Sequence, residues 1–233
     1  MKQEKHRQWW QKAVFYQIYP RSFADGNGDG LGDILGIRRH IDYLQSLGID
    51  AVWMTPVCKT PDRDHGYDIS DYYDIDPRFG SLDELNLLVE DLHRAGIKLI
   101  IDIVVNHTSD QHPWFQKSAA DPTGTYRDFY IWRKGRGYGP PNNWNSFFGG
   151  SAWTYHPGRG EYFLSIFSRH QPDLNWENPM VREEVYRMMR WWRDRGADGF
   201  RLDVINMISK DQRFPDDERE PPSIATKGTP YFV

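Results

Sequence analysis

Residues Lys98–Val105 read KLIIDIVV, an almost continuous apolar run that has the length of one β-strand. Such a run is typical of a parallel strand that is buried on both faces. A helix is predicted just before it, because Ser81 and Glu84 form an S-x-x-E capping box and Gly96 follows the last apolar position. A helix that leads into a buried strand is the repeating element of α/β folds.

The same alternation is present further upstream. Strands are predicted over Ala13–Tyr19 and Ala51–Met54, and a helix over Ile34–Leu47 separates them. The apolar side chains of this helix recur at helical spacing, at Ile34, Ile37, Ile41, Leu44 and Leu47. Strands that alternate with helices indicate parallel βαβ units.

The rhythm breaks over residues 107–177, which are rich in Gly, Pro, Asn, Trp and Tyr. Because a structureless loop of this length is uncommon, we predict a small inserted subdomain. Asn178 and Pro179 then start another helix, as N-cap and first-turn proline, and a fourth strand is predicted over Gly199–Ile205. The predicted organisation is residues 1–106 with three strands and their helices, the insertion 107–177, and 178–233 with the fourth strand.

Composition excludes several classes of partner. Hydrophobic residues make up 39% of the 233 residues and the formal net charge is only −4. A nucleic-acid or membrane-surface partner is not expected, because it would usually require a basic face. Cys58 is the only cysteine, so an intrachain disulfide is excluded. The charged start of the chain does not resemble a secretory signal and no segment reaches about 20 apolar residues, so a cytoplasmic location is expected.

The fourth predicted strand carries two charges. Arg201 and Asp203 lie two positions apart in GFRLDVIN, residues 199–206, and would therefore face the same side of the strand. Buried charges are costly unless they are paired or used. A neighbouring guanidinium favours the ionised form of a carboxyl group, and an ionised carboxylate is a competent nucleophile. A purely structural ion pair is the alternative interpretation.

A glycine-rich acidic loop, DGNGDGLGD at residues 25–33, indicates a metal site. Oxygen-bearing side chains alternate with glycines, which lets several oxygens converge on a hard cation. The predicted ligands of one structural Ca²⁺ or Mg²⁺ are Asp25, Asn27, Asp29, the carbonyl of Leu31, and Asp33. The loop opens like an EF-hand, but Gly36 stands where an EF-hand has its bidentate carboxylate. The alternative is a glycine-rich turn in which Asp33 caps the next helix.

Further candidate residues follow the second and third predicted strands. His107 ends the third strand in DIVVNH, and Asp64 and Tyr67 lie on the loop after the second strand. In parallel α/β folds the carboxyl ends of the strands meet at the active site. Gln171, in QPDLN at residues 171–175, closes the insertion, where a simple turn is the alternative.

Four sequence motifs follow one another along the chain: YQIYPRSF at 16–23, DIVVNH at 102–107, QPDLN at 171–175 and GFRLDVIN at 199–206. With them the chain resembles the α-glucosidase branch of glycoside hydrolase family 13, the α-amylase family. The resemblance covers essentially the whole chain. It implies the amino-terminal half of a (β/α)8 TIM barrel, with an inserted subdomain after the third strand, and a retaining mechanism on α-linked glucosides without an organic cofactor.

The resemblance also implies roles for individual residues. Asp203 matches the nucleophile, Arg201 the arginine that keeps it ionised, and His107 a histidine that bonds sugar hydroxyls. Further positions match sugar-binding residues: Asp64 at the non-reducing end, Tyr67 as a stacking ring, and Phe148, Phe167 and Gln171 as pocket-lining side chains. The glycine-rich loop matches a Ca²⁺ or Mg²⁺ site of this branch.

Val204 directly follows the matched nucleophile and resembles the α-1,6-preferring members, in which valine replaces the alanine of α-1,4-preferring ones. An oligo-1,6-glucosidase activity on an oligosaccharide or disaccharide is therefore expected. Trehalose-6-phosphate hydrolases and sucrose isomerases or transglycosylases are alternatives. A non-catalytic sugar-binding relative is an alternative of another class.

The chain departs from the family in one respect. Retaining hydrolysis needs two carboxyl groups about 5–5.5 Å apart, and the family places the acid/base glutamate on a fifth strand. No glutamate of this chain stands at a matching position; Glu177, Glu183 and Glu184 are expected to be structural. The expectation is an amino-terminal fragment of a longer enzyme, poorly soluble because its open sheet exposes an unpaired strand, and inactive when isolated.

Overall fold

The computed structural model of the protein describes residues 8–218. Its helices are η1 (Trp9–Gln11), α1 (Pro20–Phe23), α2 (Ile34–Arg38), α3 (Ile41–Ser46), α4 (Leu82–Arg94), α5 (Pro113–Ala120), α6 (Pro179–Asp194) and η2 (Ile205–Met207). Its strands are β1 (Phe15–Ile18), β2 (Ala51–Met54), β3 (Cys58–Lys59), β4 (Asp71–Ile75), β5 (Lys98–Val104), β6 (Trp132–Arg133), β7 (Trp153–His156), β8 (Glu161–Leu164) and β9 (Gly199–Asp203). None of the helices within residues 8–218 has the length and apolarity that crossing a membrane requires.

The four strands predicted from the sequence form one sheet in the order β1-β2-β5-β9. β1 pairs with β2 in parallel, starting at Phe15 opposite Ala51, and β2 pairs with β5 in parallel, starting at Ala51 opposite Lys98. All residues of β5 after Lys98 are buried, as its apolar run predicts. The predicted α/β class with a parallel sheet is confirmed.

The helix that precedes β5 begins as its capping pattern predicts. Ser81 Oγ accepts the backbone N–H of Glu84 at 3.3 Å, and the two side chains are 3.0 Å apart. The buried side chains of α4 are Leu85, Leu88, Val89 and Leu92. The helix ends before Gly96, whose φ of 77° suits glycine. Asn178 likewise caps α6, because its side-chain oxygen accepts the N–H of Met180 at 2.9 Å.

The single helix predicted over Ile34–Leu47 is wrong, because the structure has two short helices, α2 and α3, in its place. His40 separates them, with φ −113° and ψ 18°. Its ring Nδ1 lies 2.8 Å from the carbonyl oxygen of Gly36, the acceptor that its own N–H would need to continue the helix. The N–H of His40 bonds to Ile37 instead. Gly36 is itself required, because a Cβ there would lie 1.9 Å from the Ala24 carbonyl oxygen.

The fourth strand is shorter and less buried than predicted. β9 ends at Asp203, since Val204 adopts the left-handed conformation with φ 39° and ψ 37° and starts the 3₁₀ turn η2. This conformation is unusual for a β-branched residue. β9 is the edge strand of the sheet in the described part of the chain, and Leu202 on it is 36% exposed. The predicted exposed edge is therefore present, whereas Ile205 lies beyond the strand.

The chain divides into two compact units. The first consists of the residues up to Val57, Tyr73–Ile103 and Met189–Arg201, and the second of Cys58–Tyr72, Val104–Met188 and the residues from Leu202 onward. The first unit holds β1, β2, most of β5 and the helices α2 and α4, which pack against each other. The second contains the predicted insertion 107–177 together with segments from both sides of it.

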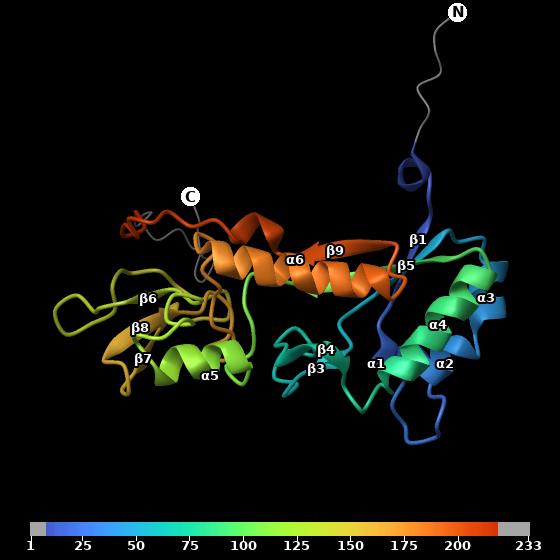
Figure 1. Cartoon of the computed structure of the whole chain (residues 1–233), viewed down its shortest axis with the longest axis horizontal. Helices are drawn as coiled ribbons and strands as arrows, with labels where there is room; N and C mark the ends of the chain where they lie inside the picture. The colour runs from blue at the N-terminus through green and yellow to red at the C-terminus, as the bar shows by residue number, and fades with distance from the viewer. Residues whose placement is uncertain (1–7, 219–233) are drawn as a thin grey trace, which may run out of the picture. The chain divides into compact units, whose positions relative to one another are not determined.

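The second unit has its own antiparallel sheet, in the order β6-β8-β7, with α5 near it in Figure 1. Trp153 on β7 pairs with Leu164 on β8, and Trp132 on β6 pairs with Phe163 on β8. A buried cluster lies against this sheet, consisting of Ile131, Trp144, Ala152, Trp153, Leu164, Ile166 and Phe214. We call these seven residues the insertion core. The many aromatic residues of the sequence are thus largely used in packing.

Candidate active site

Three of the residues predicted to bind substrate form one hydrogen-bonded group in the second unit. The side-chain amide nitrogen of Gln171 donates to Asp64 Oδ2 at 2.8 Å and lies 3.1 Å from Nε2 of His107. The side-chain amide oxygen of Gln171 accepts the N–H of Ser168 at 3.1 Å, which fixes the amide orientation. Gln171 is completely buried and His107 is 2% exposed. Segments more than 100 residues apart are thereby brought to one place.

His107 is held as a neutral imidazole. Burial, and secondarily the positive charge of Lys210, lower its pKa to about 3. Amide nitrogens face both ring nitrogens, since the Asn106 side chain lies 3.2 Å from Nδ1 and Gln171 lies against Nε2. An imidazolium would present N–H groups to both of these donors, which disfavours the charged form, whereas the hydrogen bond to the Tyr67 backbone favours it and offsets only part of the shift. A neutral imidazole offers hydrogen bonds to a hydroxyl without adding a charge.

Asp203 belongs to the same unit as this group. It ends β9 and is 9% exposed. Burial raises the pKa of Asp64, and the negative charges of Asp68 and Asp203 raise it further, against the hydrogen bond from Gln171. The negative charge of Asp203 is thus one of the smaller contributions to the raised pKa of Asp64, and both carboxylates belong to the second unit.

The aromatic candidates surround His107 unequally. The ring of Phe167 lies 5.2 Å from the ring of His107, and Phe148 lies 5.9 Å from Phe167 while remaining 62% exposed. Tyr67 is half-buried, and its backbone is hydrogen-bonded to His107 and to Asp64. All the predicted substrate-binding residues thus belong to the second unit, with the Phe148 ring facing solvent.

Arg201, which belongs to the first unit, is held by residues of two other strands of the sheet. Its Nη1 donates to both oxygens of Asp102 on β5 at 3.2 Å, and its guanidinium lies 4.9 Å from the ring centre of Trp53 on β2. Trp53 Nε1 also donates to Asp102, at 3.1 Å. The buried Asp102 therefore orients Arg201. The sequence carried the signal for Asp102, a lone charge inside the apolar run KLIIDIVV, although no role was predicted for it.

A second buried network was not predicted. Lys210 Nζ donates to Asn106 Oδ1 at 2.8 Å and forms an ion pair with Asp173 Oδ2 at 3.0 Å. The side chains of Lys210 and Asp173 are 5% and 0% exposed. Asn106 Nδ2 completes the network by donating to the other oxygen of Asp173 at 3.3 Å. Lys210 thus ties the segment after β9 to the residue next to His107. It stands in a polar stretch that gives no sign of burial.

The predicted metal loop is closed by hydrogen bonds between its own residues. Asp25 accepts the N–H groups of Gly28 and Gly30 at 2.6 and 2.7 Å, which lowers its pKa and keeps it ionised. Asp33 caps α2, because its Oδ1 accepts the N–H of Gly36 at 2.6 Å, as the alternative interpretation predicts. In residues 8–218 no three His, Cys, Asp or Glu side chains gather as a metal site would require. The loop nonetheless fits a hard cation by donor type, since Asp25, Asn27 and Asp29 offer only oxygen ligands.

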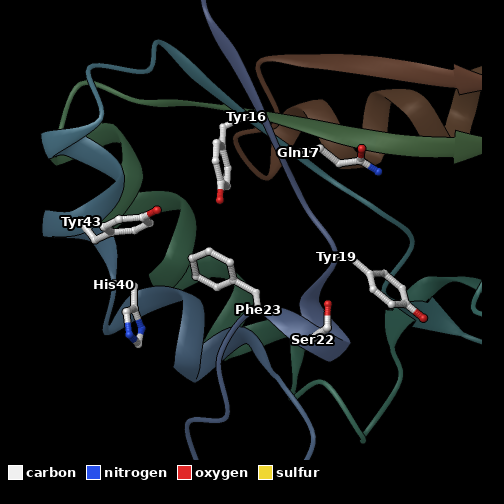
Figure 2. Close-up of a pocket in the computed structure, with 7 residues that line it drawn as sticks. All are labelled: Tyr16, Gln17, Tyr19, Ser22, Phe23, His40 and Tyr43. Carbon is white, nitrogen blue, oxygen red and sulfur yellow. The ribbon is translucent and has the colours of Figure 1, made fainter.

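The first unit also contains a cavity of about 620 Å³, drawn in Figure 2. Its lining residues are Tyr16, Gln17, Tyr19, Ser22, Phe23, His40 and Tyr43. The rings of Tyr16, Phe23 and Tyr43 point toward one another across it (Figure 2). None of the predicted site residues lines this cavity, so it is not part of the candidate active site.

His112 provides a test of how burial acts in the second unit. It is 5% exposed, and its Nδ1 caps α5 by accepting the N–H of Trp114 at 3.1 Å. Burial, followed by the charge of Lys117, lowers its pKa to about 3. As the pH falls, His112 takes up a proton in the unfolded chain near pH 6.5 but in the folded chain only near pH 3. The neutral His112 therefore does not reduce the free energy of unfolding above about pH 6.5. Between about pH 6.5 and 3 that free energy falls by about 1.4 kcal/mol per pH unit.

We expect His112→Asn to reduce this pH dependence by about that slope, because asparagine retains the cap but does not titrate. Urea unfolding at pH 6, 5 and 4 measures it. The exposed His65→Asn is the control. An unaltered slope in His112→Asn would show that His112 is not buried as a neutral residue.

Comparison with known proteins connects these observations. The α-amylase catalytic-domain family matches residues 17–232. The oligo-1,6-glucosidase of Parageobacillus thermoglucosidasius is 56% identical over 227 residues, which are 97% of this chain and 40% of that protein. The trehalose-6-phosphate hydrolase of Escherichia coli is 53% identical over 90% of this chain and 38% of that protein. The chain thus spans about 40% of the length of the curated relatives it matches.

Solved structures agree with these relatives. The trehalose-6-phosphate hydrolase of Bacillus licheniformis has a TM-score of 0.90 at 53% identity, covering 92% of this chain and 39% of that one. The isomaltulose synthase of Klebsiella sp. LX3 has a TM-score of 0.89 at 51% identity, covering 91% of this chain and 38% of that one. The parallel sheet and the sequence thus match part of a known barrel enzyme, and the chain belongs to the α-amylase family, glycoside hydrolase family 13, among its α-glucosidase-type members.

Proposed function

We propose that the chain provides the nucleophile and sugar-binding part of a retaining α-glucosidase, which acts from the non-reducing end of α-linked glucosides. Its sheet would form the amino-terminal half of a (β/α)8 barrel. The observation that carries the proposal is the convergence of Asp64, Gln171 and His107 in the unit that also holds Asp203. Asp64 and the neutral imidazole of His107 can hydrogen-bond to the hydroxyl groups of an uncharged sugar. The carboxylate of Asp203 would attack the sugar that is bound in this way.

The proposed reaction has two steps. A carboxylate oxygen of Asp203 attacks the anomeric carbon, and the bond from that carbon to the leaving oxygen breaks as this oxygen takes a proton from a second carboxyl group. Water then attacks the glycosyl ester, returns a proton to the second group and releases the sugar, so that two inversions give net retention. The second carboxyl group is not assigned to any residue of this chain.

The remaining residues would bind the sugar. Neutral His107 and the Asp64 carboxyl group provide hydrogen bonds to hydroxyl groups, and Gln171 fixes both of them relative to each other. The ring of Phe167 beside His107 offers an apolar face. Arg201, oriented by Asp102, would favour the ionised state of the nucleophile.

Within this class we propose α-1,6-linked glucosides as the substrates. The support is Val204 after the nucleophile and the oligo-1,6-glucosidases among the relatives. Relatives of about 50% identity are also named trehalose-6-phosphate hydrolase and isomaltulose synthase, so these two activities are the alternatives.

A chimera tests the function. Residues 8–218 of this chain replace the matching residues of the P. thermoglucosidasius oligo-1,6-glucosidase, and hydrolysis is followed on isomaltose, maltose, sucrose and trehalose 6-phosphate. We expect turnover, with isomaltose as the preferred substrate. Preference for another of these sugars would overturn the linkage proposal. A folded chimera that binds glucose but cleaves none of them would support a non-catalytic sugar-binding role instead.

Val204→Ala in this chimera should shift the preference from isomaltose toward maltose. The half-buried valine side chain stands directly after Asp203, so its removal changes the space at the scissile bond. Loss of two methyl groups in such a position changes discrimination by about tenfold. The ratio of kcat/KM for the two disaccharides measures the effect, and an unchanged ratio would remove Val204 from the specificity argument.

We also propose that the 25–33 loop holds one Ca²⁺ or Mg²⁺ through Asp25, Asn27, Asp29 and the Leu31 carbonyl, with Asp33 supplying a further oxygen. Removal of the metal with a chelator should lower the midpoint of thermal unfolding, because a ligand at 100 times its Kd stabilises the fold by about 2.7 kcal/mol. Calorimetry with EDTA and with added Ca²⁺ or Mg²⁺ measures this. Asp25→Asn with Asp29→Asn should abolish the difference; an equal difference in the double variant would place the metal elsewhere.

A further inference from the structure

The insertion core contains one residue from outside residues 107–177, which is Phe214. Its ring lies 5.5 Å from Trp144 and 5.7 Å from Trp153, and the guanidinium of Arg133 covers it at 4.3 Å. Phe214 is 8% exposed and has a φ of 47°, which is strained for a residue with a side chain. The surrounding contacts therefore hold it firmly in place.

Polar contacts fix the residues that follow. Asn142 Nδ2 lies 3.2 Å from the carbonyl oxygens of both Phe214 and Pro215 and donates to them. Asn143 exchanges two hydrogen bonds with Asp217: its Nδ2 donates to the carbonyl oxygen at 3.0 Å, and its Oδ1 accepts the N–H at 2.7 Å. We call residues 214–217 the strap, because they fasten the chain after β9 onto the insertion.

The same core reaches the candidate active site on two sides. Phe167, whose ring lies 5.2 Å from His107, packs against it, and so does Met207 of η2, four residues after Asp203. A side chain brought in by the strap thus supports both the sugar-binding histidine and the turn that follows the candidate nucleophile.

We propose that Phe214 is a positioning residue of the site: it completes the insertion core and so sets Phe167 against His107 and η2 behind Asp203. In this proposal Phe214 acts through these residues and not on the substrate itself. The part of this inference that concerns catalysis rests on the function proposed above, whereas the positioning of His107 does not. Small displacements of catalytic groups cost about 10- to 100-fold in rate, so the effect belongs in kcat more than in KM.

The first test uses the 233-residue chain. Arg213 precedes the strap and its side chain is 85% exposed, so trypsin reports how firmly the strap is held. Phe214→Ala should be cut at Arg213 about tenfold faster than the wild type, because cleavage follows local opening. In spectra of histidine-labelled chain, the ring signal of His107 should move while that of His40 in the first unit stays unchanged. Phe214→Leu should restore both properties, and Tyr138→Ala, at a fully exposed position of the insertion, is the control.

The second test compares the same variants in the chimera. Phe214→Ala should lower kcat about 10- to 100-fold with a much smaller change in KM, and Phe214→Leu should recover most of the loss. An unchanged His107 signal, or an unchanged kcat in an active chimera with a loosened strap, would overturn the inference. A wild-type chimera that lacks activity would count against the proposed function alone, because the position of His107 is read in the chain itself.

Discussion

Asp203→Asn should reduce turnover of isomaltose by the chimera at least about 10⁴-fold. An amide oxygen is a far weaker nucleophile than a carboxylate, and without the attack no glycosyl ester forms. Asp203 is 9% exposed, so its replacement has to fit a buried space. Asparagine has the same shape as aspartate and should therefore leave the fold intact. The expected loss is in kcat, since asparagine fills the same volume and the binding residues Asp64, Gln171 and His107 are unchanged.

Two companion variants sharpen this prediction. Asp128→Asn changes an exposed carboxylate of the second unit and should leave turnover unchanged. Asp203→Gly should regain activity when azide is added, because azide can attack the anomeric carbon from the vacated side and yield the glucosyl azide of opposite configuration. Asp203→Asn with turnover within tenfold of the wild type would exclude Asp203 as the nucleophile.

Lys210→Met should destabilise the chain by about 3–5 kcal/mol, which is a large part of the stability of a typical domain. The reason is the environment of Asp173. Its side chain is completely buried, burial raises its pKa, and the charge of Lys210 opposes that rise. Methionine fills the space of lysine up to the ε position but leaves Asp173 with an uncompensated charge in the interior.

The double variant Lys210→Met, Asp173→Asn separates the charge from the packing. Without either charge the loss should fall to about 1–2 kcal/mol, because replacement of a whole buried ion pair costs little compared with breaking it. Urea unfolding of the 233-residue chain measures both variants. Lys134→Met, at an exposed position of the insertion, is the control. A single variant as stable as the double one would show that the ion pair is not buried in solution.

The strands of the parallel sheet could be predicted because each combines an apolar run with local stop signals. KLIIDIVV is buried after its first residue, Lys98, and the Ser81 cap forms as expected. The predictions failed where a side chain competes with the backbone or where the backbone turns sharply. His40 takes the Gly36 carbonyl and splits a helix, and Val204 turns into a conformation that valine rarely adopts.

Candidate site residues could be found where they follow strand ends. Asp64, Gln171 and His107 come together as motif positions predicted, although their roles remain predictions. Lys210 and Phe214 could not be found, because both lie in a polar, proline-bearing stretch without periodicity. Their burial depends on residues far away in the sequence, such as Asn106, 104 positions from Lys210, and Trp144 beside Phe214, and local patterns do not contain such information.

The central claim is that Asp203 is the nucleophile of a retaining α-glucosidase, and trapping of the glycosyl ester tests it most directly. A fluorinated α-glucosyl fluoride forms the ester quickly and releases it slowly, so peptide mass spectrometry of the treated chimera locates the labelled residue. We predict one fluoroglucosyl group on Asp203 and a released sugar with retained α configuration. A label on another carboxylate, or turnover that inverts the anomeric configuration, would contradict the account.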